Sequence, residues 1–136
     1  MHIYQMARGT GKTTCICDEV NWCILLDIVP VCIIAPKGRM CAQFHDYLAH
    51  NLTNEEYLNI LVIHAGLDAH TPDGISNILR SIRKMNPKRI YIDEVQYLTK
   101  DFMGELQSIY DDIIYAYGTP RPGYDINYGE RYWDFK

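Results

Sequence analysis

The chain has 136 residues, of which 48% are apolar and 22% charged, and its formal net charge is −4. This length supports one hydrophobic core but not two ordinary domains, so we predict a single domain over residues 1–136 with an aromatic tail at 118–136. The acidic balance excludes an overall field that attracts nucleic acid, and no apolar run approaches the roughly 20 residues of a membrane span. Because no basic-then-apolar signal segment opens the chain, we predict a soluble, cytoplasmic protein without a membrane partner.

Short apolar runs alternate with stretches of helical periodicity along the whole chain. In chain order they predict a strand at 3–5, a helix over about 12–27, a strand at 31–35, a helix over about 38–50, a capped helical turn at 53–56, a strand at 60–63, a helix from about Asp73 to before Pro87, a strand at 89–93, a helix from Thr99 to about Tyr110 and a strand at 113–117. Apolar strands separated by helices of ten or more residues indicate a parallel sheet covered on both faces. We therefore predict an α/β fold with three α/β/α layers and a mainly parallel five-stranded sheet.

The cysteines all lie in the first third of the chain, and none forms a C-x-x-C pair. Cysteine in predicted helices and strands behaves as a small buried apolar residue, so we predict core thiols rather than a metal site or disulfides. The histidines lack the spacing of a zinc-binding helix motif, and we assign no metal to them. The cysteines are Cys15, Cys17, Cys23, Cys32 and Cys41.

The segment Met6–Thr13 reads M-A-R-G-T-G-K-T and nearly matches the phosphate-binding pattern G-x-x-x-x-G-K-[ST]. Small residues let backbone N–H groups converge on phosphate oxygens, the following helix offers its positive N-terminal end, and Lys12 adds a full charge. Thr13 stands where the pattern has a Mg²⁺ ligand. Met6 replaces the first glycine of the pattern, which weakens the match at the turn that opens the loop.

This segment supplies the predicted nucleotide-contacting residues. They are Arg8, Gly9, Thr10, Gly11, Lys12, Thr13 and Thr14. The alternative interpretation is a helix start that is merely rich in glycine and threonine.

A second chemical element, Asp93-Glu94, ends the predicted strand at 89–93. Ligands of open α/β sheets bind beyond the carboxyl ends of the strands, where this acidic pair and the loop after the first strand would meet. Asp93 is predicted to hold Mg²⁺ together with Thr13, and Glu94 to act as general base or to position water. The alternative is an acidic pair that simply ends a strand at the surface.

Taken together, these motifs resemble the P-loop NTPases that have a catalytic Glu and an additional strand between the loop and the acidic strand. In this chain the strands predicted at 31–35 and 60–63 lie between those two motifs. DExx helicases and the ATPase domain of phage terminases resemble the chain most broadly. The matching segments are Ala7–Thr14, Ile33–Arg39 with Gln43 beyond it, Asp93-Glu94, and Gly118-Thr119-Pro120, where such motors have a coupling motif that senses the γ-phosphate.

Type II thymidine kinases are the competing resemblance. They also begin almost at the loop, have D-E-x-Q-F-L after the acidic strand, and end the next strand in Y-G, which resembles Asp93–Leu98 and Tyr117-Gly118 here. In that family, the Glu matched by Glu94 would deprotonate a nucleoside hydroxyl. The chain departs from the kinases because it has no cysteine after Cys41 to form their C-terminal zinc site. It departs from the motors because it has no second motor domain and no adenine-recognising segment before the loop.

Four further features each have two interpretations. Arg121 follows the last predicted strand and fits an arginine finger or an exposed residue without a role. Arg8 in the loop fits a sensor or DNA-contacting residue, or likewise an exposed residue without a role. The basic run within 80–89 fits phosphate contacts or a solvated helix end. The aromatics of 124–135 fit base stacking or packing on a sheet edge or a neighbouring subunit.

The sequence thus predicts an ATP-binding, Mg²⁺-dependent P-loop ATPase whose catalytic residues are Lys12, Glu94 and Arg121. The biological role we favour is a minimal DNA-processing ATPase of phage or mobile-element type. DNA and either a homo-oligomer or a protein partner are its expected associates. The alternatives are a thymidine-kinase-like nucleoside kinase and a nucleotide-binding regulator with little turnover.

Overall fold

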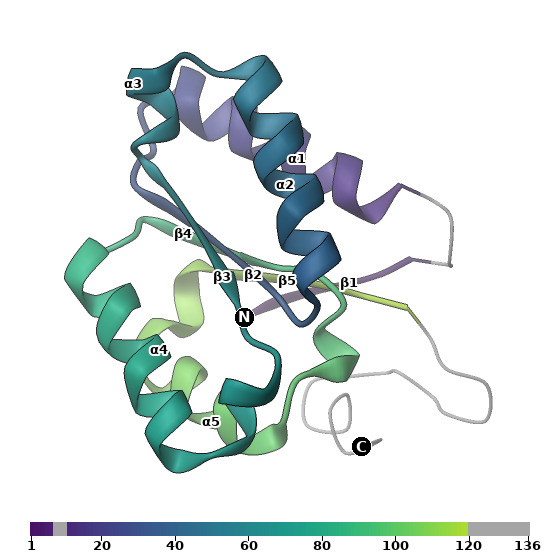
Figure 1. Cartoon of the computed structure of the whole chain (residues 1–136), viewed down its shortest axis with the longest axis vertical. Helices are drawn as coiled ribbons and strands as arrows, with labels where there is room; N and C mark the ends of the chain where they lie inside the picture. The colour runs from purple at the N-terminus through teal and green to yellow at the C-terminus, as the bar shows by residue number, and fades with distance from the viewer. Residues whose placement is uncertain (7–10, 120–136) are drawn as a thin grey trace.

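Five strands form one sheet in the order β1-β5-β4-β2-β3, and every strand pair in it is parallel (Figure 1). The computed structural model describes residues 1–6 and 11–119. The strands are β1 (His2–Gln5), β2 (Val31–Ala35), β3 (Ile60–His64), β4 (Arg89–Ile92) and β5 (Ile114–Gly118). The predicted α/β class and five-stranded sheet are confirmed, and the sheet is parallel throughout rather than mainly parallel.

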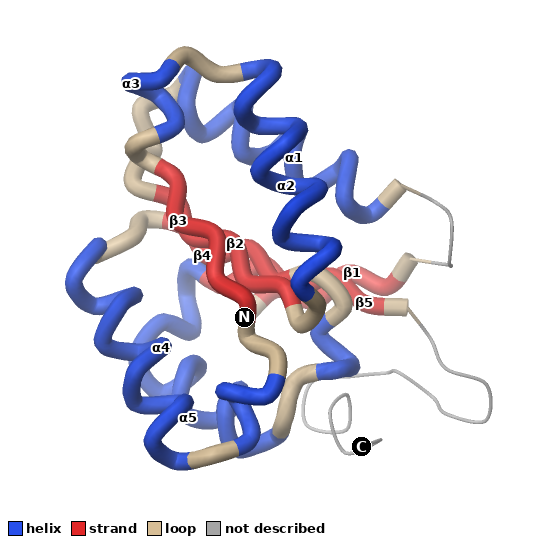
Figure 2. Tube along the Cα trace, viewed as in Figure 1, coloured by secondary structure: helices blue, strands red, loops and turns tan. Residues whose placement is uncertain are grey.

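Helices cover both faces of this sheet, which gives three layers (Figure 2). The helices are α1 (Lys12–Leu25), α2 (Gly38–Asn51), α3 (Asn54–Tyr57), α4 (Pro72–Met85) and α5 (Lys100–Tyr110). Helices α1 and α2 connect strands that progress toward β3, whereas α4 and α5 connect strands that return toward β1. Because crossovers between parallel strands are right-handed, this reversal of direction puts the two helix pairs on opposite faces.

The interior position of β2, between β4 and β3, explains why its sequence is a continuous apolar run. All five of its residues are buried. Cys32 and Ile34 belong to the core under α4 and α5, while Val31, Ile33 and Ala35 belong to the core under α1 and α2. Since successive side chains of a strand point to opposite faces, a strand covered on both sides must be apolar at every position.

The element boundaries differ from the predictions by one or two residues. Helix α1 ends at Leu25 rather than near Asp27, because the chain leaves the helix through Asp27 in a left-handed conformation with φ 57°. The last strand begins at Ile114 rather than Ile113, since a 3-10 turn, η3 (Asp111–Ile113), precedes it. The predicted strand 89–93 ends at Ile92.

The predicted turn at 53–56 is present as α3 with a complete capping box. The Thr53 hydroxyl accepts a hydrogen bond from the Glu56 N–H, and the Glu56 carboxylate accepts one from the Thr53 N–H. The two residues thereby satisfy donors that the first turn of a helix leaves unpaired.

Four of the five cysteines are buried in the core, as predicted, while Cys15 on α1 is half-buried. All five are free thiols. Burial raises the pKa of the Cys17 thiol to about 12, with smaller contributions from Asp18 and Asp93. These cysteines therefore pack as small apolar side chains. Among the described helices, none has the length and apolar character needed to cross a membrane.

Candidate functional site

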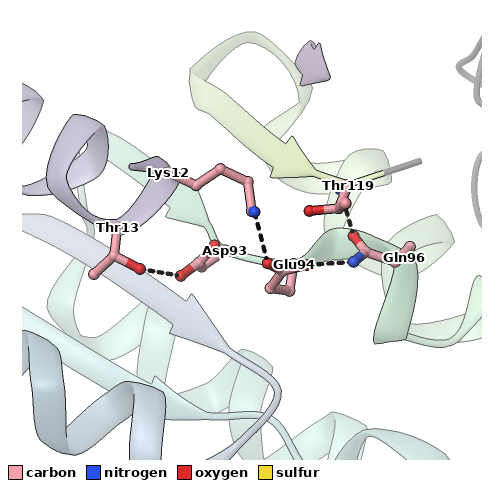
Figure 3. A network of polar contacts seen from close by, with 6 residues as sticks. All are labelled: Lys12, Thr13, Asp93, Glu94, Gln96 and Thr119. Atoms are coloured by element: carbon pink, nitrogen blue, oxygen red, sulfur yellow. Dashed lines mark hydrogen bonds and ion pairs between the residues drawn. The ribbon is translucent and has the colours of Figure 1, made fainter. Parts of the chain in front are cut away.

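The candidate site lies at the carboxyl edge of the sheet, where the segments that follow β1, β4 and β5 meet (Figure 3). Helix α1 begins at this edge with Lys12, the acidic pair follows β4, and Thr119 follows β5. Parallel strands end at the same edge, so residues separated by 80 positions come together there. The convergence of the two motifs predicted from the sequence is thus a property of the fold.

Lys12 forms an ion pair with Glu94 across this edge. The Lys12 Nζ lies 3.0 Å from Oε1 of Glu94, and the two side chains are 8% and 17% exposed. Gly11 precedes the lysine with φ 85°, a left-handed conformation that favours glycine at the start of this helix. The first helical turn therefore holds a largely buried ammonium group directly beside the acidic pair.

Thr13 and Asp93 form the second contact between the two motifs. The Thr13 hydroxyl donates a hydrogen bond of 3.1 Å to Oδ2 of Asp93. Asp93 is only 1% exposed, and its other oxygen, Oδ1, is buried without a hydrogen-bond partner among the described residues. A hydroxyl beside a carboxylate with a free oxygen is a donor set that suits a hard cation such as Mg²⁺. These two residues fit the predicted metal role.

The electrostatics of Asp93 also fit a bound cation. Burial raises the pKa of its carboxyl group to about 6, and the negative charge of Glu94 adds to the increase. The Thr13 hydrogen bond, the Lys12 charge and a backbone hydrogen bond act in the opposite direction but do not cancel it. The ionised carboxylate is therefore short of positive charge, which a divalent cation would supply.

Glu94 occupies an unusual backbone conformation. Its φ and ψ are 52° and 50°, in the left-handed region that residues with a Cβ seldom adopt. The preceding residue is still held by the sheet, since the Asp93 N–H donates to the carbonyl of Ile34 at 2.9 Å. The chain therefore turns sharply between the two acidic residues, and conformations of this kind cluster at functional sites.

Gln96 extends the network from Glu94 to the end of β5. It lies in the 3-10 turn η2 (Val95–Tyr97) and is 1% exposed. Its side-chain amide donates to Oε2 of Glu94, and its Oε1 accepts a hydrogen bond of 3.2 Å from the Thr119 N–H. Each carboxylate oxygen of Glu94 thus has a different partner, and one of them leads to the segment that follows β5 (Figure 3).

Gln96 lies in the segment that resembles thymidine kinases, and Thr119 in the segment that resembles the γ-phosphate-sensing motif of the motors, but neither was among the predicted site residues. The signal was present, because Gln96 lies two residues after a candidate catalytic Glu and Thr119 directly follows a strand. What the sequence lacked was the information that both are within hydrogen-bond distance of each other. That depends on β4 and β5 being neighbours in the sheet.

The structure places the predicted site residues differently from one another. The structure brings Lys12 and Thr13 together with Asp93 and Glu94. Thr14 is exposed on α1, outside this network. Gly11 caps α1, and Arg8, Gly9, Thr10 and Arg121 lie outside the described residues.

The basic run within 80–89 does not reach this site. Arg89 begins β4, at the opposite end of the strand from Asp93. Its guanidinium lies 4.6 Å from the ring centroid of Tyr115. The aromatics of 124–135 lie outside the described residues.

No protein-family model matches this sequence, and no curated protein matches it either.

Proposed function

We propose that this chain is a P-loop NTPase that binds a nucleoside triphosphate with Mg²⁺ and transfers the γ-phosphoryl group to water. The observation that carries the proposal is the contact of Lys12 and Thr13 with the acidic pair, across 80 residues of sequence. A lysine and a hydroxyl at the start of a helix, facing two carboxylates at a strand end, are the parts that phosphoryl transfer by this class requires.

The strand order supports the same class. The resembling NTPases have an additional strand between the loop strand and the acidic strand. The strands at 31–35 and 60–63 were predicted for that interval, but in the sheet the strand between β1 and β4 is β5. Strand β5 therefore takes the position of the additional strand, and its end, at Thr119, contacts the acidic segment through Gln96.

The ion pair suggests how nucleotide would change the site. Phosphate oxygens compete with Glu94 for the Lys12 ammonium group, because that group is the ion-pair partner of Glu94. Once that oxygen of Glu94 is released, it can accept a proton from a water molecule. The water oxygen attacks the γ-phosphorus, the bond to the bridging oxygen of the β-phosphate breaks, and the water proton passes to Glu94.

Thr13 and Asp93 would hold Mg²⁺, which supplies positive charge at the β- and γ-phosphates. Gln96 keeps the second oxygen of Glu94 in place throughout, since its side chain is buried and bonded at both ends. The attacking water and the phosphate thus face groups whose positions are fixed by β4 and α1.

A lysine variant tests the binding half of the proposal. We expect Lys12→Ala to lose most affinity for Mg²⁺-ATP, measured by calorimetry, because it removes the phosphate-binding charge. Lys84→Ala, an exposed lysine on α4, is the matched control and should bind as the parent does. Circular dichroism must show both variants folded, and parent-like affinity in folded Lys12→Ala would refute the phosphate assignment.

A glutamate variant tests the chemical half. Glu94→Gln keeps the shape of the side chain but removes its basicity, so turnover should fall on the order of a hundredfold while Mg²⁺-ATP still binds. Phosphate release and calorimetry on the same sample measure the two quantities. Equal loss of binding and turnover would instead assign Glu94 to holding the nucleotide.

The acceptor of the phosphoryl group is identified by measuring ATP turnover in three samples: the protein by itself, the protein with DNA, and the protein with thymidine. We propose hydrolysis coupled to DNA, so that DNA raises phosphate release and added salt reverses the increase by screening phosphate contacts. Thymidine monophosphate that forms with the parent but not with Glu94→Gln would establish the nucleoside kinase activity instead.

A further inference from the structure

A groove runs along the free edge of the sheet, between β1 and α1. Its volume is about 560 Å³, which lies within the range of small-molecule sites. Strand β1 has only β5 as a neighbour within the described sheet, so the groove flanks an edge strand. The residues lining it that matter here are Tyr4, Met6, Cys15, Asp18, Glu19 and Trp22.

The groove adjoins the proposed phosphate site on the side away from the acidic pair. Met6 and Cys15, which line it, flank the predicted phosphate loop in the sequence. Lys12 extends in the other direction, toward Glu94 beyond β5. A nucleotide with its γ-phosphate at Glu94 would therefore run toward β1, with its nucleoside end directed to the groove.

The distance along α1 from Lys12 to the groove suits the size of a nucleotide. Asp18 lies six residues beyond Lys12 on α1, which corresponds to about 9 Å of helix. Trp22 lies about one turn further on along α1 and also lines the groove. The near part of the groove is thus within reach of a nucleoside whose phosphates contact the first turn of α1.

The aromatic side chains of the groove present flat surfaces to solvent. Tyr4 is 44% exposed and Trp22 is 59% exposed. Tyr4 is held in place by stacking on Tyr117, with ring centroids 5.0 Å apart and 25° between the planes. A pre-positioned ring of this kind provides a stacking surface for a nucleobase.

Two carboxylates of the groove are hydrogen-bond acceptors. Asp18 and Glu19 are exposed, and neither forms an ion pair with another described residue. Carboxylates accept hydrogen bonds from ribose hydroxyls and from the amino groups of bases. The groove therefore combines a stacking surface with acceptors for the donors that a nucleoside carries.

We infer that this groove binds the base and ribose of the nucleotide, with Tyr4 and Trp22 contacting the base and Asp18 and Glu19 accepting hydrogen bonds from nucleoside donors. The inference rests on the proposed function, because the phosphate site determines which end of the ligand reaches the groove. It assigns nucleoside recognition to residues outside the phosphate loop and the acidic pair.

The test compares ATP with inorganic tripolyphosphate, both with Mg²⁺, by calorimetry. The two ligands share the phosphate chain, and only ATP can occupy the groove. The parent should bind ATP at least about tenfold more tightly than tripolyphosphate, since base stacking contributes at this level. Tyr4→Ala and Trp22→Ala should bring the affinity for ATP close to that for tripolyphosphate and leave the latter unchanged. Leu25→Ala, an exposed change on the same helix outside the groove, should alter neither.

Tyr4→Phe provides a second check, because it keeps the ring and should retain ATP affinity. Trp22 also reports directly: in a Trp133→Phe background it is the sole tryptophan, and its emission should change with ATP but not with tripolyphosphate. Unchanged tripolyphosphate binding shows that a variant is folded.

The outcomes separate this inference from the proposed function. Equal affinities for both ligands, with no effect of Tyr4→Ala or Trp22→Ala, would overturn the groove assignment and leave the phosphate site standing. Failure of both ligands to bind the folded parent would overturn the proposed function and this inference with it. If the two variants changed only the oligomeric state, the groove would be a protein contact and the inference wrong.

Discussion

Asp93 is the residue at which stability and the proposed activity oppose each other. Its side chain is 1% exposed, one oxygen lacks a hydrogen bond, and the neighbouring Glu94 carries the same charge. Ionising a buried carboxylate costs free energy that its partners here do not fully offset, which is why its pKa rises to about 6. A divalent cation bound to Asp93 would offset this cost.

We therefore predict that Asp93→Asn stabilises the protein at pH 8 in the absence of Mg²⁺. The folded-state pKa of about 6 exceeds the ordinary value of 3.8. Protonation thus favours the native state, and Asp93 costs stability as the pH rises through about 6. The gain of Asp93→Asn should be about 2–3 kcal/mol in urea unfolding at pH 8 and should vanish below pH 4. The exposed Asp112→Asn is the control, and a gain independent of pH would contradict this account.

Gln96 is predicted to position Glu94 rather than to bind nucleotide. Gln96→Ala removes the donor to Glu94 and the acceptor for the Thr119 N–H, so the carboxylate loses its fixed orientation. Turnover should fall about tenfold while the Kd for Mg²⁺-ATP changes less than about threefold. Gln43→Ala, an exposed glutamine on α2, should change neither quantity. A parallel loss of binding and turnover would mean that Gln96 acts only through the fold.

At the scale of elements, the contact between α4 and the 3-10 turn η1 (Leu67–His70) depends on a glycine. A Cβ at Gly74 would lie 1.9 Å from the backbone oxygen of Asp68. Because this clash is with backbone, no side-chain movement can relieve it. The same helix start is capped by Thr71, whose hydroxyl accepts a hydrogen bond of 3.0 Å from the Gly74 N–H. Glycine is therefore required here by close approach, although φ is ordinary.

We predict opposite effects of alanine at two helical glycines. Gly74→Ala should destabilise the protein by about 2 kcal/mol or more, because backbone must move. Gly104→Ala on α5 meets no atom within 4 Å and should stabilise by about 0.5–1 kcal/mol through helix propensity. Urea unfolding measures the free energy of unfolding of each variant. Equal destabilisation of both variants would show that the contact between α4 and η1 can relax around an alanine.

The types of the elements could be predicted from the sequence because the faces that are buried determine the spacing of apolar residues. The run 31–35 is apolar at each position since both faces of β2 are covered, and the repeat over 38–50 has one apolar face because α2 has one covered side. The ends were less predictable. They depend on single conformations such as Asp27 with φ 57°, which an Asp in the sequence permits but does not require.

At the scale of the whole molecule, strand order was the information that the sequence lacked. Periodicity records whether a side chain is buried, and says nothing of which strand lies beside it. The chain order therefore suggested strands 31–35 and 60–63 between the two motifs, whereas β5 occupies that position in the sheet. The contacts of Lys12 and Thr13 with the acidic pair could be anticipated from motif chemistry. The link from Gln96 to Thr119 could not, since it exists only because β4 and β5 are adjacent.

The pairing of β1 with β5 has a consequence for how the protein is made. Strand β1 is synthesised first, yet its hydrogen-bonding partner in the sheet comes from residues 114–118, near the end of the described chain. The segments from β2 to β4 can assemble on the ribosome while β1 has no neighbour to join. We therefore expect the carboxyl edge that holds Lys12 and Glu94 to be completed only after β5 has left the exit tunnel, so that truncated nascent chains carry the nucleotide motifs without a working site.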